Sequence, residues 1–204
     1  MTHKQYKSNI MSEIDVKSLI VESATKYFSK FGFYKTTMDE IARHIHKAKG
    51  ILYYYFKSKE ELFNEVLKQE LGMVKAKLSN IAISDIDSLV ALKEYMLTRL
   101  KLLHSAVNYH ETLKADFFEK YNFVKDVRDD FDGFEREQLT LILKKGKKDG
   151  FLDVKNINST VNIIMIVLNG IEIPFFLQNK YPEYESTIEE LTSMLVGSLK
   201  TQKK

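Results

Sequence analysis

The sequence of 204 residues predicts an all-α protein, and two observations carry that prediction. Apolar residues recur three and four positions apart through most of the chain, which is the period of an amphipathic helix. Two segments, Thr37 with Glu40 and Ser58 with Glu61, have the Ser/Thr-x-x-Glu pattern of a capping box. A capping box opens a helix by satisfying its first free N–H groups, so we expect helices to begin at both places.

A first helix is predicted over residues 16–31. Its apolar stripe consists of Val16, Leu19, Ile20, Ala24, Tyr27, Phe28 and Phe31. Gly32 follows directly and is a natural residue at the C′ position, where many helices end. We expect this helix to pack with the next two into a three-helix head, with its aromatic side chains in the core.

Two short helices follow, separated by a polar turn at residues 46–50. Successive residues of a helix lie about 100° apart around its axis, which gives the second of these helices an inward face and an outward face. The inward face holds Ile51, Leu52, Tyr55 and Phe56, and the outward face holds Gly50, Tyr53, Tyr54 and Lys57. Hydroxyl groups, a cation and a glycine that permits close approach together suit a phosphate backbone and a groove of nucleic acid.

The charge distribution agrees with that interpretation. The whole chain has a formal charge of only +3, but residues 1–60 hold 11 Lys and Arg against 6 Asp and Glu. The basic excess therefore lies in the segment with the two short helices, as an electrostatic footprint for nucleic acid requires. A solvated lysine-rich surface is the alternative.

This block of sequence resembles the DNA-binding domain of the tetracycline-repressor (TetR) family. The matching positions are Ile41, Ala42, Gly50, Leu52, Tyr53, Tyr55, Phe56, Ser58, Lys59, Glu60 and Leu62. The resemblance implies a helix-turn-helix domain over residues 14–62, followed by a helical effector-binding and dimerisation domain over residues 63–204. It also implies DNA contacts, which we expect from Thr37, Lys47, Lys49, Gly50, Tyr53, Tyr54, Tyr55 and Lys59.

Three residues of the turn depart from the family pattern. His46 stands where the family has a residue that takes positive φ freely, so we expect strain in the turn. Ala48 removes a hydroxyl that would cap the following helix, and Lys47 adds a charge. These departures bear on operator specificity more than on DNA binding itself.

Beyond Ser58 the chain predicts further helices, the first of them continuing to about Leu78. Others are expected near residues 89–103, 124–148 and 183–200, with Gly150 ending the second of these, while residues 108–121 are less regular. The most apolar segment is Val161 to Leu177, whose length approaches that of a membrane span. Because Asn162, Asn169, Glu172 and Pro174 lie within it, we favour a helix buried from two sides.

The last two long helices are expected to form a four-helix dimer interface, as the resemblance also implies. The residues that we assign to that interface are Ile166, Gly170, Ile173, Leu191, Met194 and Leu195. The second domain is also where a small molecule would bind. Candidate pocket residues are Tyr95, Met96, Arg99, Phe117, Phe118, Tyr121, Met165, Asn169 and Glu172, although the aromatic residues among them could simply fill the core.

We expect no catalytic residues, metal site or cofactor, because the sequence has no Cys and no reactive constellation. The segment from Met1 to Met11 has no apolar core of a signal peptide, so we expect a cytoplasmic protein without a membrane partner. The predicted function is a homodimeric repressor released from double-stranded operator DNA by a small, largely apolar effector. Two alternatives stay open: a nucleoid or division-control protein of the same scaffold without an effector, and an all-helical binding module or enzyme.

Overall fold

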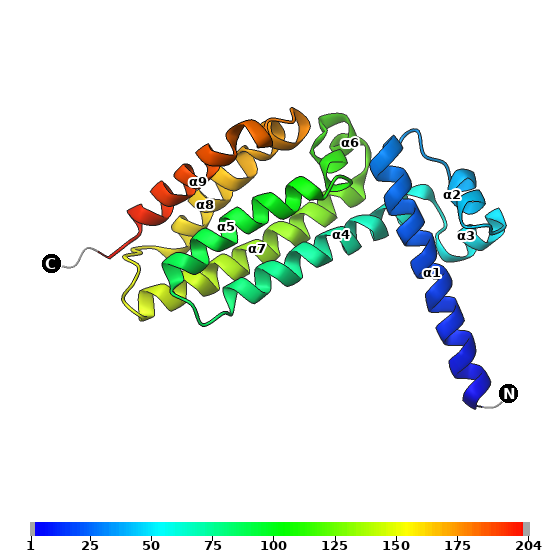
Figure 1. Cartoon of the computed structure of the whole chain (residues 1–204), viewed down its shortest axis with the longest axis horizontal. Coiled ribbons are helices and arrows are strands. Elements are labelled where there is room, and N and C mark those ends of the chain that lie inside the picture. Colours follow the sequence, from blue (N-terminus) through cyan, green and yellow to red (C-terminus); the bar gives the residue numbers. More distant parts are fainter. Residues whose placement is uncertain (1–2, 202–204) are drawn as a thin grey trace. The chain divides into compact units, whose positions relative to one another are not determined.

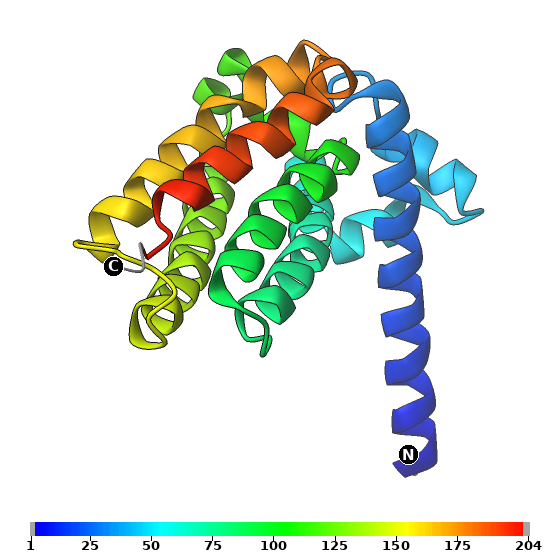
Figure 2. The same cartoon turned by 60° about the vertical axis from the view of Figure 1, so that its left-hand side comes forward.

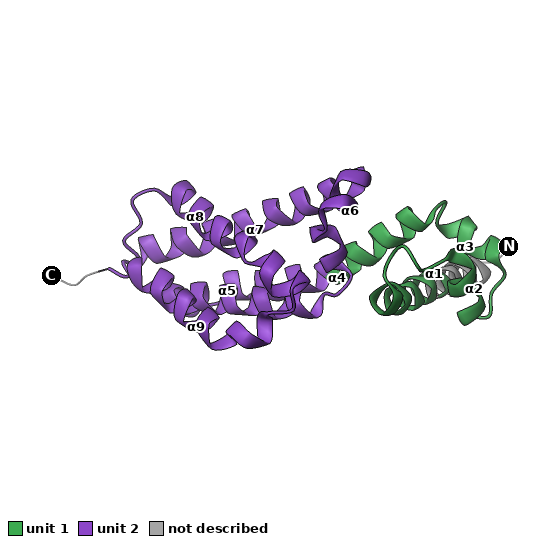
Figure 3. Ribbon diagram, turned by 90° about the horizontal axis from the view of Figure 1, so that it is seen from above, with its two compact units in different colours: residues 1–70 green, residues 71–204 purple. Residues whose placement is uncertain are grey.

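A computed structural model describes the backbone of residues 3–201 and the side chains of residues 16–201. Over this part of the chain it contains nine α-helices and no β-strand. The predicted all-α fold is therefore confirmed. The chain divides into two compact units, residues 1–70 and residues 71–204 (Figure 3).

The N-terminal unit is a three-helix head closed by the start of a fourth helix. It consists of α1 (His3–Phe31), α2 (Met38–His44), α3 (Lys49–Tyr55) and the first half of α4 (Lys59–Ala82) (Figure 1). Its core is apolar and fully enclosed, and holds Ile20, Ala24, Phe28, Phe33, Ile41, Leu52, Leu62, Phe63 and Val66. The Phe63 ring lies 4.9 Å from that of Phe28 and 5.0 Å from that of Phe33, so α4 is part of this core.

Helix α1 ends as predicted but begins earlier. Gly32 has a φ of 78°, and its N–H donates to the carbonyl oxygen of Phe28 at 2.8 Å. The expectation that the aromatic side chains of this helix lie in the core is wrong for Phe31, which is 46% exposed, and Leu19 of the same stripe is 42% exposed. They lie at the edges of the stripe, and periodicity alone does not tell where the neighbouring helices stop covering it.

The turn between α2 and α3 has the backbone that its sequence suggested. Thr37 and Glu40 form the predicted capping box at the start of α2. His46 has a φ of 52°, in the left-handed region that a residue other than glycine seldom adopts. Ala48 is the N-cap residue of α3 and provides no side-chain hydrogen bond. Both predicted departures, strain at His46 and a missing cap at Ala48, are thus present.

The C-terminal unit is a helical bundle. Its elements after α4 are α5 (Ser88–Ser105), a 3₁₀ turn (Tyr109–Leu113), α6 (Ala115–Lys120), α7 (Asn122–Lys148), α8 (Ile157–Gly170), a π-helical turn (Ile173–Leu177) and α9 (Tyr181–Ser198). Helix α5 packs against α7 and α9, and α7 packs against α8. Figures 1 and 2 both show α8 and α9 running alongside each other at one side of the bundle.

The most apolar segment is not one continuous helix. Residues 157–177 are long and apolar enough to cross a membrane by length and composition, the one such segment in the described chain. However, α8 ends at Gly170, and the π-helical turn follows after two residues. Glu172 in this break is 1% exposed and ion-paired inside the bundle, which is the environment of a folded core rather than of lipid.

Candidate nucleic-acid interface and interior ion network

The outward face of α3 is open to solvent. Tyr54 is 73% exposed and Tyr53 is 43% exposed, while Leu52 on the opposite face is completely buried. Gly50 and Lys57 are exposed as well, as the helical wheel predicted. Leu52 and Phe56 anchor the helix to the head, so the tyrosines have a rigid base.

The remaining residues of the helix lie between these two faces. Tyr55 is half-buried, and its ring meets that of Tyr54 edge to face at 5.1 Å. Ile51 was expected to face inward but is 36% exposed, because it precedes the part of α3 that the core covers. Tyr55 thus supports the position of Tyr54.

The cations near α3 differ in how firmly they are held. Lys47 in the turn is exposed. Lys49 is also exposed, but its Nζ lies 2.8 Å from Oδ1 of Asp39 and 5.6 Å from the centroid of the Tyr53 ring. The hydrogen bond from Lys49 to Asp39 and the charge of that carboxylate raise the pKa of Lys49. Asp39 was not among the predicted site residues.

Thr37 and Lys59 both take part in the structure of the head. The Thr37 N–H donates to Oε2 of Glu40 at 2.9 Å, and the Glu40 N–H donates to Oγ1 of Thr37 at 3.3 Å. Lys59 Nζ donates to the carbonyl oxygens of Phe33 at 2.8 Å and of Thr36 at 3.1 Å. Lys59 thus ties α4 to the loop before α2, a structural role that sequence reasoning missed.

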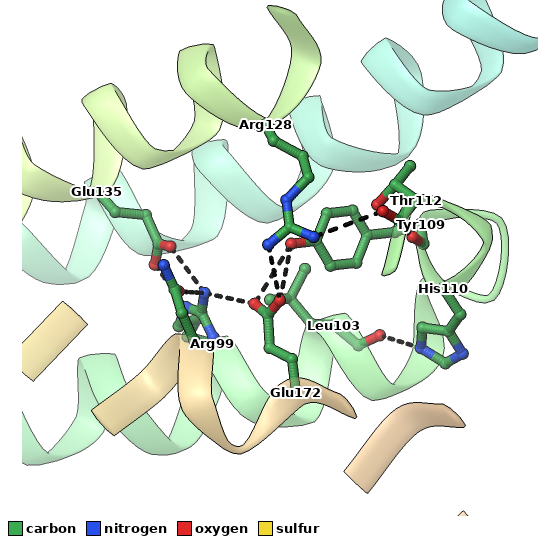
Figure 4. Close-up of polar contacts among 9 residues, drawn as sticks. Arg99, Leu103, Tyr109, His110, Thr112, Arg128, Glu135 and Glu172 are labelled. Carbon is green, nitrogen blue, oxygen red and sulfur yellow. Dashed lines mark hydrogen bonds and ion pairs between the residues drawn. The ribbon is translucent and has the colours of Figure 1, made fainter. Parts of the chain in front are cut away.

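A second concentration of polar groups lies inside the C-terminal unit, around Arg99 of α5 (Figure 4). Arg99 Nε donates to Oε1 of Glu135 at 2.7 Å, and Nη2 donates to Oε2 of Glu135 at 2.9 Å. The same Nη2 donates to Oε1 of Glu172 at 2.7 Å. All three side chains are at most 1% exposed. The bidentate geometry makes this a strong pair, which a buried charge requires.

Further groups from α7, the 3₁₀ turn and α8 complete this ion network. The Tyr109 hydroxyl donates to Oε2 of Glu172 at 3.1 Å, and the Asn169 amide oxygen accepts from Arg99 at 2.9 Å. Arg128 Nη2 lies 3.6 Å from Oε2 of Glu172. Two arginines thus face two glutamates. Burial raises the pKa of Glu135, and the charge of Arg99 opposes that shift.

The structure does not bring the predicted pocket residues together in one place. Arg99, Asn169 and Glu172 meet in the ion network. Met96 instead lines a small apolar cavity of about 110 Å³ between α5, α8 and α9, together with Leu92, Ile163 and Leu195. Phe117 and Tyr121 pack on each other at 4.7 Å around α6, whereas Phe118 is 42% exposed. Tyr95 and Met165 are buried in the bundle.

Sequence reasoning missed Glu135, Tyr109 and Arg128. Glu135 had a readable signal, because it continues an apolar stripe of α7 in which Phe131, Leu139 and Ile142 are completely buried. A carboxylate at a core position requires a buried partner. Tyr109 and Arg128 had no such signal.

Several residues assigned to the dimer interface lie uncovered on α8, on the turn after it and on α9. Ile166 is 72% exposed, Ile173 is 50% exposed and Met194 is 68% exposed. Gly170 is exposed, and Leu191 and Leu195 are half-buried.

A short helix with buried anchors and exposed tyrosines, preceded by a turn and a capped helix, defines a helix-turn-helix DNA-binding domain. Residues 20–66 match the family model described as bacterial regulatory proteins, tetR family. The N-terminal unit thus matches the DNA-binding domain that this family model describes.

Similar proteins include the HTH-type transcriptional regulator YhgD of Bacillus subtilis, 48% identical over 64 residues, which are 31% of this chain and 34% of YhgD. The match therefore spans about a third of the length of that relative.

Among solved structures, a transcriptional regulator from Cytophaga hutchinsonii aligns with a TM-score of 0.78 and 25% identity, over 90% of this chain and 98% of that one. The regulator FadR from Bacillus subtilis, in complex with stearoyl-CoA, aligns with a TM-score of 0.68 over 88% of this chain and 95% of that one. At 14% identity, this second likeness shows the fold alone.

Proposed function

We propose that this protein is a homodimeric, ligand-responsive transcriptional repressor that acts in the cytoplasm. The observation that carries the proposal is the exposed face of α3, with Tyr53 and Tyr54, on a head that matches the family model. An exposed aromatic surface beside lysines fits the phosphates and the major groove of a DNA duplex.

In this proposal α3 lies in the major groove. Lys47, Lys49 and Gly50 meet base edges, because they lie at the N-terminal end of α3, where recognition helices usually contact bases. The sugar-phosphate backbone is contacted by Tyr53, Tyr54 and Tyr55. Further phosphates beside the major groove are contacted by Thr37 and Lys59. A two-fold axis would place two such helices about 34–36 Å apart, which is one turn of DNA, or a multiple of that distance.

The proposed dimer forms through α8 and α9. Large apolar side chains that are more than half exposed, such as Ile166 and Met194, favour a contact with another protein surface. An isologous pairing of the two helices with their counterparts would bury both residues in a four-helix arrangement. Exposed Gly170 would let the helices approach closely.

The proposed effector binds in the C-terminal unit. The cavity of about 110 Å³ beside Met96 is lined mostly by apolar residues, which favours an apolar molecule. Ligand pockets usually measure about 300–1,000 Å³, so a ligand would have to separate α5, α8 and α9 to enter. Because α8 and α9 also carry the proposed dimer interface, that movement would change the dimer. The binding of stearoyl-CoA by FadR supports a ligand role for this fold.

Regulation would follow from a difference in affinity. A ligand that prefers a dimer with misplaced heads shifts the population away from DNA. A coupling of ~1–3 kcal/mol changes operator affinity by roughly 5–150-fold. Helix α4 runs from residue 59 in the head to residue 82 in the bundle and is the element that would transmit the change.

Genomic footprinting of bound sites would identify an operator and the genes beside it. With that operator, Tyr53→Phe is expected to weaken binding by about 0.5–1.5 kcal/mol for each lost hydrogen bond, without a change in melting temperature. Tyr184→Phe in the C-terminal unit is the matched control and should bind normally. If Tyr53→Phe binds the operator as tightly as the unchanged protein, the proposed contact of the Tyr53 hydroxyl is wrong. If the unchanged protein binds no duplex, the proposed function is wrong.

A DNA-binding protein of this scaffold without an effector is the main alternative. A metabolite panel in a thermal-shift assay separates the two, because an effector that binds the folded state raises the melting temperature. A binding module or enzyme would leave DNA unshifted in a gel.

A further inference from the structure

Asp39 and Lys49 form an ion pair between the first turns of α2 and α3. Asp39 Oδ1 lies 2.8 Å from Lys49 Nζ, and the two side chains are 54% and 56% exposed. Ion pairs with this much exposure usually contribute little to stability, because water screens the two charges. The pair is therefore not needed to hold the head together.

The position of the carboxylate is unusual for a surface that meets DNA. A negative charge beside phosphates weakens binding, unless the carboxylate accepts hydrogen bonds from a base. In the major groove such donors are the amino groups N4 of cytosine and N6 of adenine. Asp39 lies beside Lys49 at the N-terminal end of α3. Lys47 and Gly50, the chain neighbours on either side of this end, are exposed and are both proposed to contact base edges.

The ammonium of Lys49 still has donors for a second partner. A lysine ammonium carries three N–H groups, and one of them is directed to Asp39. The Tyr53 ring, whose centroid lies 5.6 Å from Nζ, holds the charge by a cation–π interaction. The pair therefore offers adjacent donors and acceptors in a defined orientation.

We propose that Asp39 and Lys49 together read one G·C base pair in each half of the operator, which makes Asp39 a specificity-determining residue. This inference rests on the proposed DNA binding. In a G·C pair, N4 of cytosine donates to O6 of guanine, so these atoms lie about 2.9 Å apart. The 2.8 Å between Lys49 Nζ and Asp39 Oδ1 matches that spacing. Lys49 donates to guanine, and Asp39 accepts from cytosine N4.

An A·T pair satisfies the same two side chains less well. Guanine presents two neighbouring acceptors, N7 and O6, to the remaining donors of Lys49. In A·T the amino group N6 stands between two separate acceptors, adenine N7 and thymine O4, so Lys49 beside Asp39 can reach only one of them. G·C thus offers three hydrogen bonds where A·T offers two.

Selection of bound duplexes from a random-sequence library tests the inference with the full chain. The unchanged protein should select a two-fold symmetric motif with one strongly preferred G·C pair per half-site. In Asp39→Ala and in Lys49→Met, that preference should fall roughly tenfold while the other positions keep theirs. Glu22→Ala is the matched control, since Glu22 forms an exposed ion pair with Lys26 on α1, and its motif should be unchanged. Circular dichroism would verify that each variant is folded.

A modified base gives a second measurement. Replacement of that guanine by 7-deazaguanine removes N7, so it should weaken binding of the unchanged protein several-fold and leave Lys49→Met unaffected. Two results would overturn the inference. One is an unaltered motif in Asp39→Ala. The other is tighter binding of Asp39→Ala to all sequences alike, because it would show that the Asp39 carboxylate only repels phosphates. If the unchanged protein binds no duplex, the proposed function fails and this inference fails with it.

Discussion

Two residues of the turn before α3 lower the stability of the head. A left-handed backbone costs about 1–2 kcal/mol in a residue with a Cβ atom, and His46 adopts it. Ala48 leaves the first N–H groups of α3 without a side-chain acceptor. The helix that carries the exposed tyrosines is therefore held mainly by Leu52 and Phe56, both at most 2% exposed.

Restoration of the cap is expected to stabilise the head. In Ala48→Ser, the new hydroxyl can accept from an N–H of the first turn of α3, which should raise the free energy of unfolding by ~0.5–2 kcal/mol. Denaturant unfolding of the variant beside the unchanged protein measures this. Ala48→Val lacks an acceptor and is the control, and equal stability of the serine and valine variants would contradict the prediction.

At the residue scale, the exposed face of α3 followed from sequence, but the contacts of its cations did not. The wheel placed Tyr53 and Tyr54 outward because an α-helix turns about 100° per residue. The pairing of Lys49 with Asp39, and of Lys59 with the carbonyl oxygens of Phe33 and Thr36, depends on how separate segments meet. Helical periodicity describes one segment at a time.

At the scale of the elements, the ion network joins α5, α7 and the break after α8. Arg99 in α5 bonds Glu135 in α7 and Glu172 between α8 and the π-helical turn. A π-helical turn often marks a functional position, and here it follows directly on a buried carboxylate. The network thus connects the interior with the segment that bears exposed Ile173.

Removal of the central charge should be severe. Arg99→Met leaves buried Glu135 without an ionic partner and leaves Glu172 with only Arg128 and Tyr109, so we expect a loss of ~3–5 kcal/mol in the free energy of unfolding. Lys75→Met, which removes the ion pair between Lys75 and Asp130 near the surface, should cost no more than about 1 kcal/mol. Denaturant unfolding of both variants provides the comparison, and a loss below about 1 kcal/mol for Arg99→Met would show that the network is not structurally required.

Apart from the start of α1, which lies at His3 and not at residue 16, the elements were predictable to within a few residues where their apolar stripes were regular. The helix predicted at 124–148 is α7, residues 122–148, and Gly150 beyond it has a φ of 77°. The segment of residues 161–177 was misjudged as one helix, because a uniformly apolar run has no periodicity that would mark its break. The break lies where Glu172 turns toward Arg99.

At the scale of the whole molecule, the main feature is a set of large apolar side chains that are exposed on α8, on the π-helical turn after it and on α9. Ile166, Ile173 and Met194 are each at least half exposed, and the predicted interface residues include all three. A dimer would cover them and would set the distance between two heads. Light scattering with size-exclusion chromatography measures the mass directly.

A charge in this face should dissociate the proposed dimer. Ile166→Glu would bury an unpaired carboxylate from each subunit, which costs ~3–5 kcal/mol and weakens association more than a hundredfold. The variant should elute as a monomer and lose affinity for two-half-site DNA. Val90→Glu on α5, where Val90 is 54% exposed, is the control and should remain dimeric. A dimeric Ile166→Glu variant would place the interface elsewhere.

The sequence by itself determined the all-α class, the helix-turn-helix head and the outward face of α3, because capping and helical period are local properties of consecutive residues. Only the tertiary structure decided that Arg99 forms buried ion pairs with Glu135 and Glu172. It also decided that Asp39 pairs with Lys49 and that Ile166 on α8 is exposed. These features join residues far apart in the chain, and their partners are selected by packing, which no single segment encodes.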